Sequence, residues 1–207
     1  MQNVTRRLDK QRGFSLIELL VASSVGLIVL ATVGSVFVSG QKFASDRAKQ
    51  LMLAQDMNDA IRFIKTDVQR AGYNADNTGS LVLSGALSTI SANAGSLSYV
   101  YEDENSKWRI VKFRQNPNNL QSLQMCVDTV SKGVPAMPID ASCSDSGVVE
   151  QLLDLSHINV TGFTVTPTVL ATPSATSTLL TITLSASLKN SNYSKTVSTT
   201  IKARNWK

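Results

Sequence analysis

Histidine is nearly absent from this chain, because His157 is the only one among 207 residues. A histidine-based catalytic apparatus would rest on that single residue, and one histidine with two cysteines does not make a zinc site of usual spacing. Gly133, Gly147 and Gly162 stand alone, so no glycine-rich loop is available to hold a phosphate group. We therefore predict no enzymatic activity, no cofactor and no metal site.

Charged side chains are also missing from residues 14–38, where Glu18 is the one exception. A helix needs about 20 apolar residues to cross the bilayer core, and this run supplies about 25. The leader before it is basic, and Lys or Arg beside a span keep that end in the cytoplasm. We therefore predict one membrane span over residues 14–38, with the N-terminus inside and the chain after Gln41 outside.

Glu18 is unusual, because a carboxylate within hydrocarbon costs about 2.5–3.5 kcal/mol on insertion scales and normally marks a function and a partner. Residues 12–19, with the sequence RGFSLIEL, resemble the cleavage and methylation motif of type IV pilins and their relatives. The resemblance implies that prepilin peptidase cuts after Gly13 and that Phe14 becomes the N-methylated first residue. It also implies that the Glu18 carboxylate meets the N-terminal amine of a neighbouring subunit. A buried carboxylate is tolerable beside such a hydrogen-bonded cation.

An ordinary secretory signal and a plain membrane anchor are the alternatives for this segment. A secretory signal has an apolar region of about 7–15 residues followed by small residues at its cleavage site. The run here is longer, although residues 38–40 could serve as a weak cleavage site. A plain anchor leaves Glu18 unexplained, which favours the pilin motif.

Excess positive charge largely belongs to the leader, residues 1–13. The whole chain has 20 Lys and Arg against 15 Asp and Glu, a net charge of +5. The leader holds four of the cations and one of the carboxylates, so its removal leaves 16 against 14, or +2. This balance is weak evidence for nucleic-acid binding by the remaining chain.

One short segment keeps nucleic acid open as an alternative partner. Cations interleaved with aromatic rings can hold single-stranded nucleic acid. The residues in question are Lys107, Trp108, Arg109, Lys112, Phe113 and Arg114. The favoured interpretation is an amphipathic strand with a solvated face, because Lys and Arg spread along a strand mostly serve solubility.

The only two cysteines, Cys126 and Cys143, both follow the predicted span. Disulfides persist outside the inner membrane, and an even number of cysteines there favours pairing. We predict a Cys126–Cys143 disulfide, which would close a loop of about 18 residues and stabilise the fold by about 3 kcal/mol in the chain-entropy model.

Proline and glycine are absent from residues 41–71, which predicts that the helix continues beyond the membrane. Apolar residues recur there at steps of three and four, with charged residues mostly off that stripe. The stripe comprises Leu53, Met57, Ala60, Ile61, Ile64, Val68 and Ala71. Gly72 occupies the C-cap position. The prediction is one helix over residues 14–71, a length of about 87 Å at 1.5 Å per residue.

The end of this helix carries a second resemblance. Residues 58–73, which finish with Arg-Ala-Gly-Tyr, are similar to the helix-end signature of PilW-type minor pilins. J-type pseudopilins of type II secretion share parts of it. We expect the ring of Tyr73 to pack back on the helix end, with no chemical role.

Residues 72–207 are predicted to form a β-rich domain outside the membrane. Residues 74–95 are expected to be loop with one short strand, and residues 102–105 and 190–192 to be turns. Alternating apolar residues predict strands at 97–101, 107–114, 123–127, 158–165, 180–186 and 195–204. The alternation changes phase between Ile110 and Val111, which indicates a bulge or a strand covered on both faces. Residues 166–177, with Pro167 and Pro173, are predicted to be loop.

The sequence therefore predicts an α+β pilin-like fold, in which a long N-terminal helix packs on a C-terminal antiparallel sheet. The resemblance implies a minor pilin of a type IV pilus that primes assembly. Its expected partners are prepilin peptidase, other major and minor pilins, and the inner-membrane assembly machinery. Its expected location is the inner membrane and then the periplasm or pilus. A secretion pseudopilin, and a tip subunit that binds DNA or a surface, are the alternatives.

Overall fold

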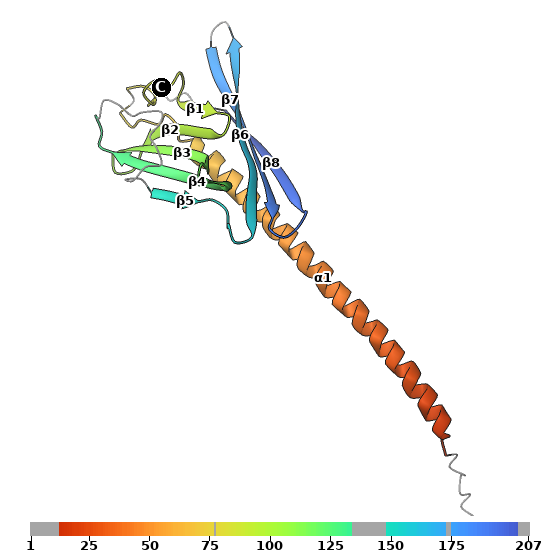
Figure 1. Ribbon diagram of the computed structural model, residues 1–207. Helices are drawn as coiled ribbons and strands as arrows, with labels where there is room; N and C mark the ends of the chain where they lie inside the picture. Colours follow the sequence, from red (N-terminus) through yellow and green to blue (C-terminus); the bar gives the residue numbers. More distant parts are fainter. Residues whose placement is uncertain (1–12, 77, 134–147, 173–174, 203–207) are drawn as a thin grey trace, which may run out of the picture. The chain divides into compact units, whose positions relative to one another are not determined.

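The computed structural model describes residues 13–76, 78–133, 148–172 and 175–202. The chain divides into two compact units, residues 1–48 and 49–207, and each is described by itself. One helix, α1 (Leu16–Val68), runs from the first unit into the second (Figure 1). The predicted long N-terminal helix is therefore confirmed, although it begins and ends slightly inside the predicted bounds of 14 and 71.

In the first unit, α1 has exposed apolar side chains on all sides. Leu20, Leu27 and Leu30 are each more than half exposed, and so is Phe37. The helix is long and apolar enough to cross a membrane, judged by length and composition. An apolar surface of this extent is unfavourable in water, so the exposure agrees with the predicted span.

In the second unit, α1 buries the apolar stripe that its sequence predicts. The buried helical residues are Leu53, Met57, Ala60, Ile61, Ile64 and Val68. They belong to one core together with residues of both β-sheets. The ring of Phe63 on the helix meets the ring of buried Phe113 edge to face, with centroids 6.3 Å apart.

The larger sheet has five antiparallel strands in the order β1-β2-β3-β4-β5 (Figure 1). They are β1 (Ile90–Asn93), β2 (Ser96–Glu102), β3 (Trp108–Asn116), β4 (Asn119–Val130) and β5 (Val148–Gln151). Each strand pairs with its neighbour in sequence, so the sheet is a meander. The predicted turn over residues 102–105 joins β2 to β3.

The smaller sheet has three antiparallel strands in the order β6-β7-β8. They are β6 (Ile158–Thr172), β7 (Ala175–Leu188) and β8 (Ser194–Lys202). On β7, Leu180, Ile182, Leu184 and Ala186 are fully buried, as their alternation with Thr and Ser predicts. These side chains join the same core as the larger sheet and the helix.

The predicted loop over residues 166–177 is wrong, because β6 and β7 extend through most of it. Pro167 lies within β6 and pairs with Leu180 of β7. Proline has no backbone N–H to donate, but β6 is an edge strand with a ladder on one side only, where proline is tolerated. The presence of Pro167 therefore does not end the strand, as the sequence prediction had assumed.

The phase change in β3 arises from burial on both faces. Val100 pairs with Ile110 and Tyr99 with Val111, so the register shows no bulge there. Val111 faces the main core, whereas Ile110 packs with Leu83 and Val100 in a second, smaller cluster. Of the two interpretations that the sequence allowed, the strand covered on both faces is correct.

Candidate functional site

The predicted cleavage position lies just before the helix. Gly13, Phe14 and Ser15 are described but are not helical, and α1 begins at Leu16. The side chain of Phe14 is 92% exposed. The peptide bond between Gly13 and Phe14 is therefore outside the helical hydrogen-bond ladder.

Glu18 caps the start of its own helix. The backbone N–H of Ser15 donates to the Glu18 carboxylate at 3.0 Å, and the Ser15 carbonyl accepts from the N–H of Leu19 at 3.2 Å. A glutamate three residues after a serine N-cap, bonded back to its N–H, is half of a capping box. This capping role was not predicted, although the Ser-x-x-Glu spacing is a known sequence signal for it.

The other end of α1 is tied to β2 by a polar network. The hydroxyl of Tyr99, a fully buried residue, donates to the carboxylate of Asp67. Arg70 lies 3.8 Å from the same carboxylate, and its guanidinium donates to the Tyr101 hydroxyl at 3.4 Å. Burial, followed by the negative charge of Asp67, raises the pKa of Tyr99 well above its usual value. Tyr99 is thus a neutral donor that holds the helix end on the sheet.

Glu102 is a buried carboxylate beside this network. It accepts the backbone N–H of Ala75 at 2.9 Å and a hydrogen bond from the Lys132 amine at 2.9 Å. That amine also lies 2.6 Å from Asp76. Hydrogen bonds to Asp76 and then to Glu102 raise the pKa of Lys132. The sequence placed Glu102 in an acidic turn, and its burial could not be predicted because its partners are distant in sequence.

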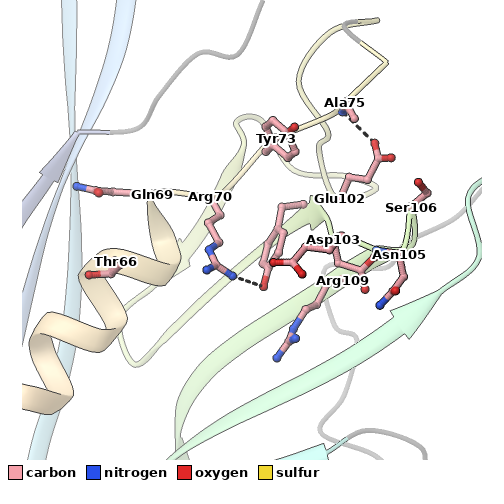
Figure 2. A pocket seen from close by; sticks show the side chains of 12 residues that line it. Thr66, Gln69, Arg70, Tyr73, Ala75, Glu102, Asp103, Asn105, Ser106 and Arg109 are labelled. Atoms are coloured by element: carbon pink, nitrogen blue, oxygen red, sulfur yellow. Dashed lines mark hydrogen bonds between the residues drawn. The ribbon is translucent and has the colours of Figure 1, made fainter.

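A pocket of about 770 Å³ opens between the end of α1 and the β2–β3 hairpin. Its walls are polar and carry charges of both signs. The lining comprises Thr66, Gln69, Arg70, Tyr73, Ala75, Tyr101, Glu102, Asp103, Glu104, Asn105, Ser106 and Arg109. Figure 2 shows Arg70 entering from the helix end and Arg109 from β3, with Glu102 and Asp103 on the hairpin side. Tyr73 is 41% exposed at the pocket wall.

The interleaved cations and aromatic rings of β3 do not gather on one face. Arg109 and Phe113 lie on the face of β3 that carries buried Val111, whereas Lys112 and Arg114 lie on the other face. Phe113 is fully buried in the core and cannot stack on a base. Trp108 shares the face of Lys112 and Arg114, where it is partly buried against the smaller cluster. The cations and rings are therefore divided between two faces and do not form the single strip that the sequence pattern allowed.

The two cysteines and the single histidine are the remaining positions that the sequence singled out. Cys126 is buried on β4, but Cys143 lies outside the described residues, so the disulfide stays a prediction. His157 is exposed, and its backbone N–H donates to the carbonyl of Asp154. Across the part of the chain that the structure describes, no group of three or more His, Cys, Asp or Glu side chains could hold a metal ion.

Comparison with known proteins identifies two matching families. The family model described as prepilin peptidase-dependent protein B matches residues 46–203. The model of the prokaryotic N-terminal methylation motif matches residues 8–34, which include Gly13, Phe14 and Glu18. No curated protein matches the chain significantly, and no solved structure does so either.

Proposed function

Since the chain belongs to the family of prepilin peptidase-dependent protein B, we propose that it is a minor pilin subunit of a type IV pilus. Its type IV pilin-like character rests on the family match over most of the chain and on the methylation motif at its start. The observation that carries the proposal is the combination of this motif with a helix that is exposed and apolar in one unit and packed on a sheet in the other.

Processing is the first step of the proposed function. Prepilin peptidase cuts between Gly13 and Phe14, and the new N-terminal amine of Phe14 is methylated. The exposed, non-helical backbone at Gly13 and Phe14 supports cleavage there. The same cut removes most of the positive charge that holds the N-terminus in the cytoplasm.

Before assembly, residues 14–38 span the inner membrane with the N-terminus in the cytoplasm, and the β-domain lies in the periplasm. During assembly, the Glu18 carboxylate pairs with the methylated terminal amine of a neighbouring subunit. A carboxylate in an apolar environment is stabilised by a cation with hydrogen bonds, and removal of one partner leaves an uncompensated charge. This pairing selects the next subunit and sets its register in the filament.

The exported domain is closed by a disulfide between Cys126 and Cys143. The burial of Cys126 on β4 supports a structural rather than a reactive role for this cysteine. By similarity to PilW-type proteins, the subunit joins other minor pilins to prime the pilus, together with the inner-membrane assembly machinery, and has no enzymatic activity.

The alternative candidate is a J-type pseudopilin of a type II secretion system, because the helix-end signature at residues 58–73 is partly shared. A deletion strain separates the two. Loss of surface pili with normal protein secretion supports the minor pilin, whereas normal pili with defective secretion would replace it by the pseudopilin. N-terminal sequencing of the exported chain tests processing, and a start other than methylated Phe14 would contradict it.

A further inference from the structure

Two arginines from distant parts of the second unit line the pocket beside the helix end. Arg70 comes from the turn after α1, and Arg109 comes from β3, where it pairs with Tyr101 of β2. The Arg70 guanidinium lies over the Tyr101 ring at 5.6 Å from its centroid. In Figure 2 the two guanidinium groups point toward the same side of the pocket. The pocket therefore has two positive charges in its lining, beside the side chain of Tyr101.

Arg109 differs from the other charged groups of the pocket in its bonding. Glu102 is neutralised by Lys132, Arg70 contacts Asp67 and Tyr101, and Asp103 accepts backbone N–H groups of its own turn. The Nε of Arg109 is buried without an acceptor among the described residues. A buried donor without an acceptor is uncommon in folded proteins. Arg109 is thus a half-buried cation whose Nε has no hydrogen-bond acceptor in the described part of the chain.

We propose that this pocket binds the carboxylate side chain of a neighbouring pilin subunit, which Arg109 and Arg70 hold together. A carboxylate accepts paired hydrogen bonds from a guanidinium, and such charge-assisted bonds are about twice as strong as neutral ones. The volume of about 770 Å³ admits a side chain and part of its backbone. The inference rests on the proposed function, since it assumes that the chain packs against other pilins.

The acidic hairpin beside the two arginines decides between a protein and a nucleic acid as the occupant. Asp103 and Glu104 lie at the same pocket, and Glu104 is exposed. A nucleic acid would bring a series of phosphates past these carboxylates, and juxtaposed like charges disfavour a partner by several kcal/mol. A single Asp or Glu brings one negative charge instead of a series, so its repulsion by Asp103 and Glu104 is smaller, and the two arginines can offset it. The occupant is therefore an acidic side chain within a segment of mixed charge.

Zero-length cross-linking of the full chain tests this contact. Arg109→Lys keeps the positive charge and supplies an amine that a carbodiimide couples only to a carboxylate in direct contact. Sheared pili and membranes from cells that carry the variant are treated with the reagent, and the linked peptides are identified by mass spectrometry. We expect a link from position 109 to an Asp or Glu of another pilin, which wild-type chains cannot form. Coupling only to Glu102, Asp103 or Glu104 of the same chain, or no coupling, overturns the proposal.

Charge removal provides the matched functional test. Arg109→Gln leaves the Arg70–Tyr101 bond in place and removes one cation of the pocket. We expect the amount of this subunit in sheared pili to fall about tenfold, while its amount in the membrane fraction stays unchanged. A tenfold fall corresponds to about 1.4 kcal/mol of lost contact free energy. Lys107→Gln removes the same charge from an exposed side chain outside the pocket and should have no effect. Equal incorporation of both variants contradicts the proposal.

Two further outcomes are distinguishable. If the purified full chain in detergent binds a DNA oligonucleotide and Arg109→Gln weakens that binding, the occupant is nucleic acid and the carboxylate proposal is wrong. If the wild-type chain is absent from pili but is needed for secretion, the proposed function fails. The cross-link in the membrane fraction then still decides whether the pocket holds a carboxylate of a neighbouring pseudopilin.

Discussion

Ser15 and Glu18 are joined by a hydrogen bond in which the backbone N–H of Ser15 donates to the Glu18 carboxylate at 3.0 Å. Glutamate satisfies an otherwise unpaired N–H at the helix start in this way, and glutamine can do the same. Pairing with the terminal amine of another subunit, in contrast, requires a negative charge. Glu18 therefore has a local role, which needs an acceptor atom, and a proposed role in assembly, which needs a carboxylate.

Glu18→Gln separates these two roles. The variant keeps the acceptor that caps the helix, so we expect normal membrane insertion and cleavage after Gly13. It lacks the charge that the terminal amine needs, so we expect a fall of at least tenfold in the subunit recovered with sheared pili, about 1.4 kcal/mol or more. Immunoblots of sheared and membrane fractions measure both quantities.

Glu18→Ala is the companion variant, because it removes the cap as well as the charge. If the two variants are equally defective in assembly, the charge is the decisive property. Wild-type pilus incorporation of Glu18→Gln, together with a defect of Glu18→Ala, would instead assign Glu18 to helix capping alone.

Tyr99→Phe should destabilise the second unit. The change removes the buried hydroxyl that donates to Asp67 and leaves that mostly buried carboxylate with Arg70 at 3.8 Å. A buried acceptor that loses its donor costs about 1–3 kcal/mol. Denaturant unfolding of the full chain in detergent measures the loss. Tyr101→Phe is the matched control. Its effect should be smaller, because the Tyr101 hydroxyl accepts a long hydrogen bond of 3.4 Å from Arg70, whose side chain is 60% exposed.

The raised pKa of Tyr99 predicts alkaline destabilisation. In the unfolded chain a tyrosine loses its proton near pH 10, whereas folded Tyr99 stays neutral well above that value. The contribution of neutral Tyr99 to the free energy of unfolding is therefore complete below about pH 10, and it is lost as the pH rises toward the folded pKa. Thermal unfolding followed from about pH 8 to about pH 11 should show a shallower alkaline decline for Tyr99→Phe than for the wild type. Equal slopes would exclude this contribution of Tyr99.

Local and periodic features of the fold were predictable from the sequence. The stripe from Leu53 to Val68 and the alternation along β7 identify the surfaces that become the core, because burial follows the period of each element. The early end of α1 at Val68, instead of Ala71, is a different case. There the backbone leaves the helix in hydrogen-bonded turns, and Gly72 donates to the carbonyl of Val100. A contact with a strand about 30 residues away sets that boundary, and no local pattern contains it.

The pocket was beyond sequence reasoning for a similar reason. Arg109 looked like one member of a basic strip, but strand alternation puts it on the face opposite Lys112 and beside Tyr101. Glu102 was predicted to lie in an acidic hairpin turn. Its carboxylate is in fact buried, and it accepts hydrogen bonds from the Lys132 amine and the Ala75 backbone N–H, both distant in sequence. The burial and the partners of a charged side chain depend on residues distant in sequence, whereas the period of the apolar residues is visible in the sequence itself.

Reduction of the exported chain should lower its stability. A Cys126–Cys143 bond would restrict the unfolded chain, and its loss should cost about 3 kcal/mol in the chain-entropy model. We expect a lower denaturant midpoint in the presence of a thiol reductant. The double variant Cys126→Ala/Cys143→Ala should be insensitive to the reductant. Labelling of both cysteines by a thiol reagent in the non-reduced, denatured chain would contradict the pairing.

Gly72→Ala should be among the more damaging single substitutions in the second unit. Gly72 has φ +81°, and an added Cβ would lie 2.7 Å from the Cγ2 of Thr89. A non-glycine residue in this backbone region costs about 1–3 kcal/mol, and the close contact adds to that cost. Gly79→Ala separates the two causes, because Gly79 has φ +112° with no atom near the added Cβ. Thr89→Ser removes the clashing methyl group, so Gly72→Ala/Thr89→Ser should recover part of the lost free energy of unfolding. If the double variant recovers nothing beyond the stability of Gly72→Ala, backbone strain alone explains the loss.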